Sequence, residues 1–174
     1  IIKQEVEVGG KTLTLEHGRF ASFANSNITA RYGDTVVVAT VVAAPLKQEL
    51  DYFPLTVDYM EKLYAGGRIK GSRWVKRDGR PSDDEILTSR LIDRSIRPLF
   101  PKSYKKDVQV IAMVLSVDGE NDPGVLAMTA VSAALSTSNI PWNGPVGSLR
   151  VGAKNGTFFA NPVTNDLEFS DLDL

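Results

Sequence analysis

The run TVVVATVVAA (residues 35–44) constrains the fold of this chain more than any other stretch of the sequence. Its residues are almost all apolar and mostly β-branched, so a strand formed here would present apolar side chains on both faces. It is also the longest apolar run in the chain, yet it is far shorter than the ~20 residues that a membrane-spanning helix needs. The sequence therefore predicts a central strand in the sheet of a soluble protein.

Turn signals elsewhere predict strands that pair with their neighbours. Residues 3–8 and 11–17 alternate polar and apolar side chains around Gly9-Gly10, a two-residue turn in which glycine supplies positive φ. Asn155-Gly156, the strongest short hairpin signal, predicts a second hairpin near the end of the chain. The segments expected to form strands beside these turns and beside residues 35–44 are 27–33, 54–64, 108–117, 148–154 and 157–162.

Two helices are expected among these strands. The first should begin at Ser82, because its hydroxyl can cap the first turn while Glu85 reaches back to complete a capping box, and it should run to about Ser95. The second should begin at Asp122 with Pro123 in the first helical position, and its many alanines suggest close packing on a sheet. Since strands outnumber helices and hairpins are frequent, we expect one α+β domain, with two layers and a mixed or largely antiparallel sheet.

Positive charge is concentrated in one part of the chain. The whole sequence has a formal net charge of −1, but residues 62–106 contain thirteen of the twenty Lys and Arg residues and only five of the acids. This segment therefore has a surplus of eight positive charges, whereas the rest of the chain is acidic. Such asymmetry predicts a local site for a polyanion.

The segment RIKGSRWVKRDGRP (residues 68–81) carries six of these charges and one aromatic side chain. Arginine can donate two parallel hydrogen bonds to phosphate, and an indole can stack on any base, so the combination favours binding of single-stranded nucleic acid. Two alternatives stay open: the segment is a solvated surface loop, or its tryptophan anchors the loop to the domain. The candidate nucleic-acid-binding residues here are Arg73, Trp74, Lys76, Arg77 and Arg80.

The first helix extends this basic region. Arg90, Arg94 and Arg97 follow one another at i, i+4 and i+7, which predicts a cationic stripe along one side of the helix, and we count all three as candidate nucleic-acid-binding residues. Leu87 and Leu91 lie to one side of this stripe and are expected to face the core. The alternative is that acids such as Asp93 pair the arginines structurally.

Familiar catalytic patterns are absent from the sequence. The chain has no cysteine and one histidine, His17, without the neighbours of a metal site or catalytic triad. Gly71 and Ser72 are followed by an arginine, unlike the Walker pattern. Asp51, Asp58 and Asp122 could bind Mg²⁺ if they converge, but their spacing does not show it. We therefore assign no catalytic residue and no metal ligand from the sequence.

The motifs YAGGRI, GRPS, LIDR and RPLFP are ordered as in one known family. Residues 51–101 closely resemble the first RNase PH-like core of the bacterial polynucleotide phosphorylases, and the resemblance extends from GRFA (18–21) through IPWNGPVGSLRVG (140–152). It implies a fold like domain 2 of ribosomal protein S5. It also implies a transferase that degrades RNA from its 3′ end by phosphorolysis, releases nucleoside diphosphates, and can run in reverse as a polymerase.

The resemblance also implies roles for the basic residues. The family's loop reads Phe-Phe-(Lys/Arg)-Arg-Glu-Gly-Arg-Pro and matches residues 74–81, and in the family the loops of three subunits ring the channel that takes RNA. Trp74 can keep the stacking role, but Val75 stands where the second aromatic is expected, so one stacking platform should remain. Arg90, Arg94 and Arg97 match family arginines near the RNA path.

Partners and cofactors are implied in the same way. The implied partners are single-stranded RNA, two further copies of the chain in a homotrimer, and the RNA-degradation machinery. The implied cofactor is Mg²⁺, and inorganic phosphate is the co-substrate. The implied location is the cytoplasm, with no membrane partner. In the family the phosphate-binding serines and metal-binding aspartates belong to a second core. We expect residues 1–174 to be a first core that precedes the helical linker, second core, KH and S1 domains, and to be inactive alone. The alternative is a non-catalytic S5-like module that binds RNA or has a structural role.

Overall fold

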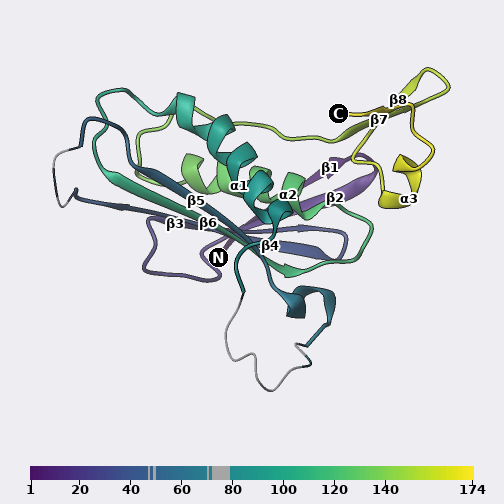
Figure 1. Ribbon diagram of the computed structural model, residues 1–174, viewed down its shortest axis with the longest axis horizontal. Coiled ribbons are helices and arrows are strands. Elements are labelled where there is room, and N and C mark those ends of the chain that lie inside the picture. The colour runs from purple at the N-terminus through teal and green to yellow at the C-terminus, as the bar shows by residue number, and fades with distance from the viewer. Residues whose placement is uncertain (47, 49, 70, 72–78) are drawn as a thin grey trace.

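The computed structural model describes residues 1–46, 48, 50–69, 71 and 79–174. Its main feature is a six-stranded sheet in the order β1-β2-β3-β4-β6-β5 (Figure 1). All neighbouring strands in this sheet are antiparallel except β5 and β6, which are parallel. The strands are β1 (Ile2–Val8), β2 (Lys11–His17), β3 (Ser26–Tyr32), β4 (Thr35–Ala44), β5 (Leu55–Glu61) and β6 (Asp107–Ser116).

The expected mixed sheet and the central place of residues 35–44 are confirmed. Strand β4 lies between β3 and β6, and its side chains Val37, Ala39 and Val41 are completely buried. The side chains on its other face, such as Val36 and Val38, are only partly buried. One face of the sheet therefore holds the core, and the opposite face is less well covered.

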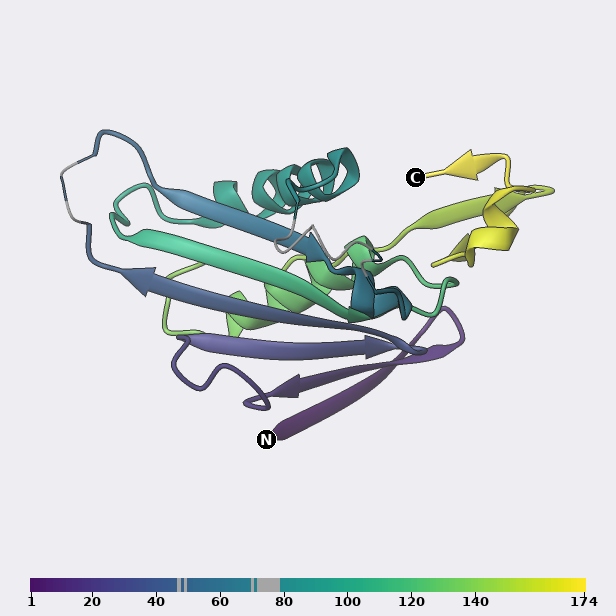
Figure 2. The ribbon, with the colours of Figure 1, turned by 60° about the horizontal axis from the view of Figure 1, so that its bottom comes forward.

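Two long helices, α1 (Asp83–Ile96) and α2 (Pro123–Ser136), pack on the buried face of the sheet (Figures 1 and 2). Helix α2 lies on β3 and β4, and α1 lies on β5. Small side chains permit this arrangement: Ala127, Ala130 and Ala134 of α2 are fully buried. A side chain at Gly124 would come within 3.3 Å of Thr88 on α1. The expected packing of the alanine-rich helix is confirmed, and so is the two-layer α+β fold.

Both helices begin where the sequence predicted. The hydroxyl of Ser82 accepts a hydrogen bond from the backbone amide of Glu85, and the Glu85 carboxylate accepts one from the amide of Ser82, which completes the capping box. The Asp122 carboxylate accepts hydrogen bonds from the amides of Gly124 and Val125. These bonds satisfy amides that have no partner inside the helix.

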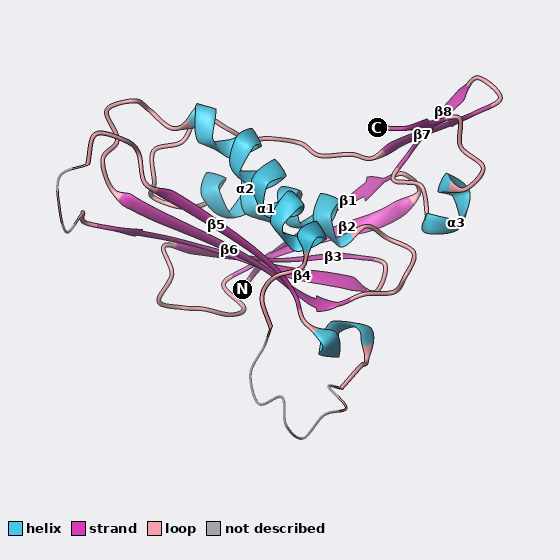
Figure 3. Cartoon of the chain, in the orientation of Figure 1, coloured by secondary structure: helices cyan, strands magenta, loops and turns pink. Residues whose placement is uncertain are grey.

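A small second sheet lies beyond the end of the core layers (Figure 3). It has the order β8-β7-β9, and Asn155-Gly156 form the expected turn between β7 and β8, both with positive φ. Arg150 links this sheet to α2, because its guanidinium forms ion pairs with Asp122 and Asp173, both at 2.7 Å. The elements are β7 (Val151–Lys154), β8 (Thr157–Ala160), α3 (Thr164–Leu167) and β9 (Leu172–Asp173).

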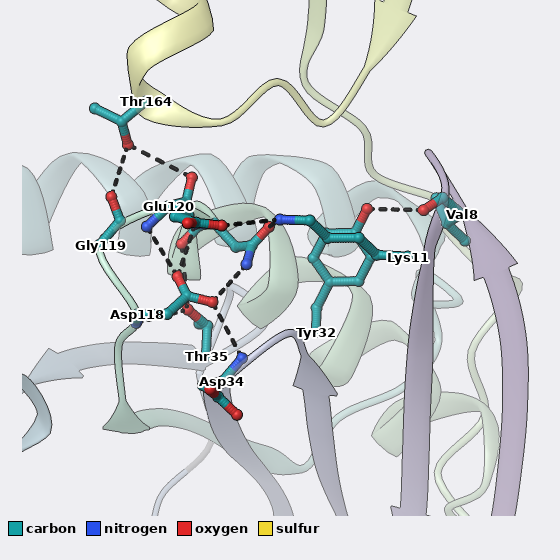
Figure 4. Close-up of polar contacts among 10 residues, drawn as sticks. Val8, Lys11, Tyr32, Asp34, Thr35, Asp118, Gly119, Glu120 and Thr164 are labelled. Atoms are coloured by element: carbon teal, nitrogen blue, oxygen red, sulfur yellow. Dashed lines mark hydrogen bonds and ion pairs between the residues drawn. The ribbon is translucent and has the colours of Figure 1, made fainter.

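A polar cluster around Asp118 fixes the turn between β3 and β4 against the segment before α2 (Figure 4). The Asp118 carboxylate accepts hydrogen bonds from the Thr35 hydroxyl at 3.0 Å, from the Asp34 amide at 3.1 Å, and from the Glu120 and Asn121 amides at 2.9 Å. Partial burial raises the pKa of Asp118, but the hydrogen bonds from Asn121, Glu120 and Thr35 outweigh it and hold that pKa well below its usual value.

Candidate nucleic-acid interface

A surface groove lies where β5 ends and α1 begins. Its volume is about 950 Å³, and both ends of the basic segment lie beside it. Strand β5 forms one wall, the first turns of α1 form another, and a short 3₁₀-helix, η1 (Leu63–Gly66), closes the end. The lining residues are Val57–Arg68 without Ala65, Gly66 and Gly67, together with Ile69, Gly79, Arg80, Pro81, Glu85, Ile86, Ser89 and Arg90.

Helix α1 is held in place by the free edge of β5. The amide of Tyr59 donates a hydrogen bond to the Ser89 hydroxyl at 3.0 Å, and the amide of Glu61 donates one to the Glu85 carboxylate at 2.8 Å. Residues four apart on a helix are about 6 Å apart along its axis, and residues two apart on a strand are separated by about 6.6 Å. The two spacings match, so the helix side chains satisfy the edge amides and fix the groove between them.

Two carboxylates in the groove are already occupied by internal donors. The buried phenol of Tyr59 donates a short hydrogen bond to Glu61, and burial followed by this bond raises the pKa of Tyr59 far above its usual value. Partial burial raises the pKa of Glu85, but the hydrogen bonds from Ser82 and Glu61 outweigh it, and the net pKa lies below the usual value. Glu85 is therefore ionised at neutral pH.

Arginines without internal partners make the groove a candidate site for an anion. Arg68, Arg80 and Arg90 all line it, and all three are exposed. Within the described ranges none of their side chains forms an ion pair or hydrogen bond with another part of the chain. An exposed guanidinium without an internal partner is free to donate two hydrogen bonds to a phosphate.

The arginine stripe that the sequence predicted on α1 is divided among three environments. Arg90 lines the groove together with Arg80, while Arg94 is exposed outside it. Arg97 is bound to Asp93 through two hydrogen bonds of 2.9 and 2.5 Å, and it also donates to backbone carbonyls at the start of β5. The structural pairing that the sequence left open is therefore present at Arg97. Its side chain is still 41% exposed.

The remaining candidates, Arg73, Trp74, Lys76 and Arg77, lie outside the described residues. The structure describes Gly71 before them and Gly79 after them, and Gly79 lines the groove. Their role stays a prediction from the sequence.

The expectation that Leu87 and Leu91 face the core is wrong. Their exposed fractions are 62% and 60%, whereas Ile92 and Ile96 are fully buried. The reason is the rotation of α1. Its Glu85 and Ser89 side chains must reach the edge of β5, and this places the opposite side of the helix in solvent.

The sequence reasoning missed Tyr64, because residues 54–64 were expected to form one strand. In the structure β5 ends at Glu61 and Tyr64 lies in η1. Tyr64 lines the groove and is 55% exposed. Its hydroxyl donates a hydrogen bond to the sulfur of Met113 at 3.5 Å. The glycine pair after Ala65 was the signal that the strand had already ended.

Neither a metal site nor a membrane span is found in the part of the chain that the structure describes. Asp51, Asp58 and Asp122 do not converge, and no group of three or more Asp, Glu, His or Cys side chains there could hold a metal ion. No described helix has both the length and the apolar character required to cross a membrane.

Comparisons with known proteins agree on one family. Residues 9–141 match the model of the 3′ exoribonuclease family, domain 1. Proteins named polyribonucleotide nucleotidyltransferase are 54% identical in Methylocella silvestris and 53% identical in Rhodospirillum centenum, each over the whole chain. The relative in Geobacter sulfurreducens is 51% identical over 99% of the chain. The chain spans about a quarter of the length of these relatives.

The fold also matches a solved structure. The crystal structure of rice (Oryza sativa) Rrp46 superposes with a TM-score of 0.65 and covers 90% of this chain and 70% of its own. At 14% sequence identity this likeness concerns the fold alone.

Proposed function

The chain belongs to the 3′ exoribonuclease family, and from this premise we propose that its groove holds single-stranded RNA for a phosphorolytic 3′-to-5′ exoribonuclease. The observation that carries the proposal is the joint position of Arg80 and Arg90, two exposed arginines without internal partners on one groove. Arg80 lies at the end of the basic segment, before the helix cap Ser82, and Arg90 lies after the cap on α1, so both can donate to the same sugar-phosphate chain.

An aromatic surface in the same groove supports a single strand over a duplex. The exposed ring of Tyr64 offers a face on which a base can stack, and such stacking contributes ~1–3 kcal/mol per base without demanding a particular sequence. In a duplex the bases stack on each other and are not available to the ring. Trp74, which lies outside the described residues, is proposed as a second platform, and Arg73, Lys76 and Arg77 as further phosphate contacts.

The proposed reaction places simple demands on this chain. Inorganic phosphate attacks the phosphorus of the 3′-terminal phosphodiester, the bond to the 3′ oxygen of the preceding nucleotide breaks, and a nucleoside diphosphate leaves. The residues of this chain bind and orient the strand, because the described lining of the groove brings exposed cations and an aromatic ring together. The Tyr59 hydroxyl, which donates to Glu61 there, belongs to a buried residue. The described residues do not fit Mg²⁺, so no step is assigned to it here.

Further parts of the proposal rest on the family alone. They are a homotrimer whose basic segments surround the RNA, contact with the RNA-degradation machinery, and a cytoplasmic location. The catalytic groups would come from another part of a longer protein, since the relatives are about four times as long as this chain.

The binding proposal is tested with the 174-residue chain and a labelled single-stranded oligoadenylate. Fluorescence anisotropy at several salt concentrations should show that Arg80→Ala and Arg90→Ala each weaken binding several-fold and lower the salt slope by about 1. Lys105→Ala is the control, because Lys105 is exposed but precedes β6, at the end of the sheet away from the groove. Equal affinities and slopes in all four proteins would remove the groove from the RNA path.

The catalytic proposal needs a separate assay in a protein of the relatives' full length that carries this chain. With phosphate and Mg²⁺ added, nucleoside diphosphates are the expected products. Nucleoside monophosphates would indicate hydrolysis. Binding without any mononucleotide product would favour the alternative of a non-catalytic RNA-binding module.

A further inference from the structure

One carboxylate in the groove is held in place and can still accept further hydrogen bonds. Glu61 is the last residue of β5, it is exposed, and it lines the groove. Its carboxylate accepts a hydrogen bond from the hydroxyl of Tyr59, a residue that is only 3% exposed. Among the described residues, no other group donates to this carboxylate. Because a carboxylate offers about four lone-pair sites, it can accept from a ligand as well.

The position of Glu61 is fixed before any ligand enters the groove. Its backbone amide donates to Glu85 at 2.8 Å, and its carboxylate is bound by the Tyr59 hydroxyl. The Tyr59 amide in turn donates to the Ser89 hydroxyl of α1 at 3.0 Å. A side chain that is already ordered loses little conformational entropy when it binds, so it can contribute to affinity and to specificity.

A carboxylate is an unfavourable neighbour for a polyanion unless the ligand also carries a donor. Arg68, Arg80 and Arg90 line the same groove and attract phosphates, whereas Glu61 repels them. Glu85 also lines the groove, but each of its oxygens already accepts a hydrogen bond from a backbone amide. Glu61 is therefore the carboxylate that a donor on the ligand would satisfy.

The ribose of RNA supplies such a donor. Its 2′-hydroxyl can donate a hydrogen bond, it is absent from DNA, and it is the group by which proteins tell the two nucleic acids apart. The sugar of a nucleotide lies between its phosphate and its base. A strand with phosphates on Arg80 and Arg90 and a base on Tyr64 therefore has its riboses in the groove that Glu61 lines.

We propose that the Glu61 carboxylate accepts a hydrogen bond from a ribose 2′-hydroxyl and makes the groove selective for RNA over DNA. This inference rests on the function proposed above, because it needs a nucleic-acid strand in the groove. With DNA the carboxylate would face the phosphates without a donor. The lost hydrogen bond and the remaining repulsion then act in the same direction, against the wrong ligand.

The test compares three labelled oligoadenylates of equal length: RNA, DNA and 2′-fluoro RNA. The fluorine keeps an RNA-like sugar pucker but cannot donate a hydrogen bond, so it separates the donor from the shape of the strand. Anisotropy titrations of the wild-type chain at fixed salt and neutral pH give the three affinities. RNA should bind about tenfold more tightly than either of the other strands, the effect of one hydrogen bond to a charged group.

Substitutions at Glu61 assign this discrimination to the carboxylate. Glu61→Ala removes the acceptor, so the affinities for RNA and DNA should come within about twofold of each other. Glu61→Gln keeps an oxygen acceptor at the same place and should retain a preference for RNA of at least about threefold. Asp83→Ala is the matched control, because it removes an exposed carboxylate that does not line the groove, and the preference for RNA should stay as in the wild type.

A second variant keeps the test valid if Glu61→Ala does not fold. That change leaves the buried hydroxyl of Tyr59 without its acceptor, which is destabilising. The double variant Y59F/E61A removes both partners of the bond and should fold, with the same loss of preference for RNA. Circular dichroism verifies the fold of every variant.

Equal affinities of the wild type for RNA and for 2′-fluoro RNA would overturn the inference, because the donor would then have no effect. So would a preference for RNA that persists in Glu61→Ala or in the double variant. In both cases the proposed function stands as long as Arg80→Ala and Arg90→Ala weaken RNA binding. A wild-type chain that binds none of the three strands would remove the proposed function and this inference together.

Discussion

The carboxylate of Glu85 accepts a hydrogen bond of 2.8 Å from the backbone amide of Glu61, and this contact joins the first turn of α1 to the last residue of β5. The second oxygen of the same carboxylate accepts from the amide of Ser82 at 2.7 Å. One side chain therefore caps a helix, satisfies the edge of a sheet and fixes two walls of the groove.

Replacement of Glu85 should cost more than an ordinary surface change. Glu85→Ala removes both acceptors and leaves two amides to water, so we expect a loss of about 1–2 kcal/mol in the free energy of unfolding. Urea unfolding followed by circular dichroism measures it. Asp83→Ala is the matched control on the same turn, because Asp83 is exposed and forms no cap bond, and it should change stability by at most about 0.5 kcal/mol. Equal losses in the two variants would contradict the double role of Glu85.

Tyr64 offers a test that separates the ring from the hydroxyl. Tyr64→Ala should weaken binding of single-stranded RNA at least about fivefold, because a stacked base contributes ~1–3 kcal/mol. Tyr64→Phe keeps the ring and loses only the hydrogen bond to Met113, so its affinity should stay within about twofold of the wild type. Anisotropy titrations at fixed salt give both values. A loss in the phenylalanine variant as large as in the alanine variant would show that stacking is not the cause.

The basic segment itself supplies a prediction from the sequence alone. Trp74→Ala and Arg77→Ala should both weaken single-stranded RNA binding, and the arginine change should also flatten the dependence of affinity on salt. The tryptophan change should leave the salt slope as it is, because an indole releases no counterions. Unchanged affinity and slope in both variants would remove this segment from the RNA-binding surface.

Two glycines with similar backbones separate steric crowding from backbone strain. Gly33 and Gly10 both have positive φ, at 63° and 79°, but a Cβ at Gly33 would lie 2.6 Å from Asn121 Nδ2 and 2.7 Å from Asp118 Oδ2, whereas one at Gly10 meets nothing within 4 Å. Gly10→Ala should therefore cost about 1 kcal/mol, from backbone strain alone. Gly33→Ala should cost at least about 1 kcal/mol more, because it also disturbs the Asp118 cluster. Thermal and urea unfolding of the pair test this, and equal costs would show that the cluster yields without penalty.

The depressed pKa of Asp118 predicts how stability depends on pH. Its folded pKa lies below the unfolded one, so the unfolded state binds the proton first as the pH falls. The stabilisation is fully present above the usual Asp pKa of about 4, and it is lost as the pH falls from there through the folded pKa. Asp118→Asn should lower stability at pH 7 and reduce the difference in stability between pH 7 and pH 3. A variant with the same acid dependence as the wild type would assign that dependence to other carboxylates.

Local features of the fold were predictable because their causes are local. Asn155-Gly156 adopts positive φ in any context that allows a tight turn, and Ser82 with Glu85 can form a capping box wherever a helix begins. The apolar run at residues 35–44 required burial and became the central strand β4. The sequence predicts a strand that continues to residue 64, whereas β5 ends at Glu61 and η1 begins at Leu63. The alternation of polar and apolar side chains does not show where the strand ends and η1 begins.

The candidate site was only partly predictable. The sequence alone determined the hairpins, the helix starts, the family and the concentration of positive charge, since these depend on neighbouring residues or on motifs. Only the tertiary structure decided that Arg90 reaches the groove, that Arg97 turns to Asp93, and that Leu87 and Leu91 face outward. The physical reason is that the rotation of α1 depends on the bonds from Ser89 and Glu85 to the edge of β5, a strand that lies more than twenty residues earlier in the chain.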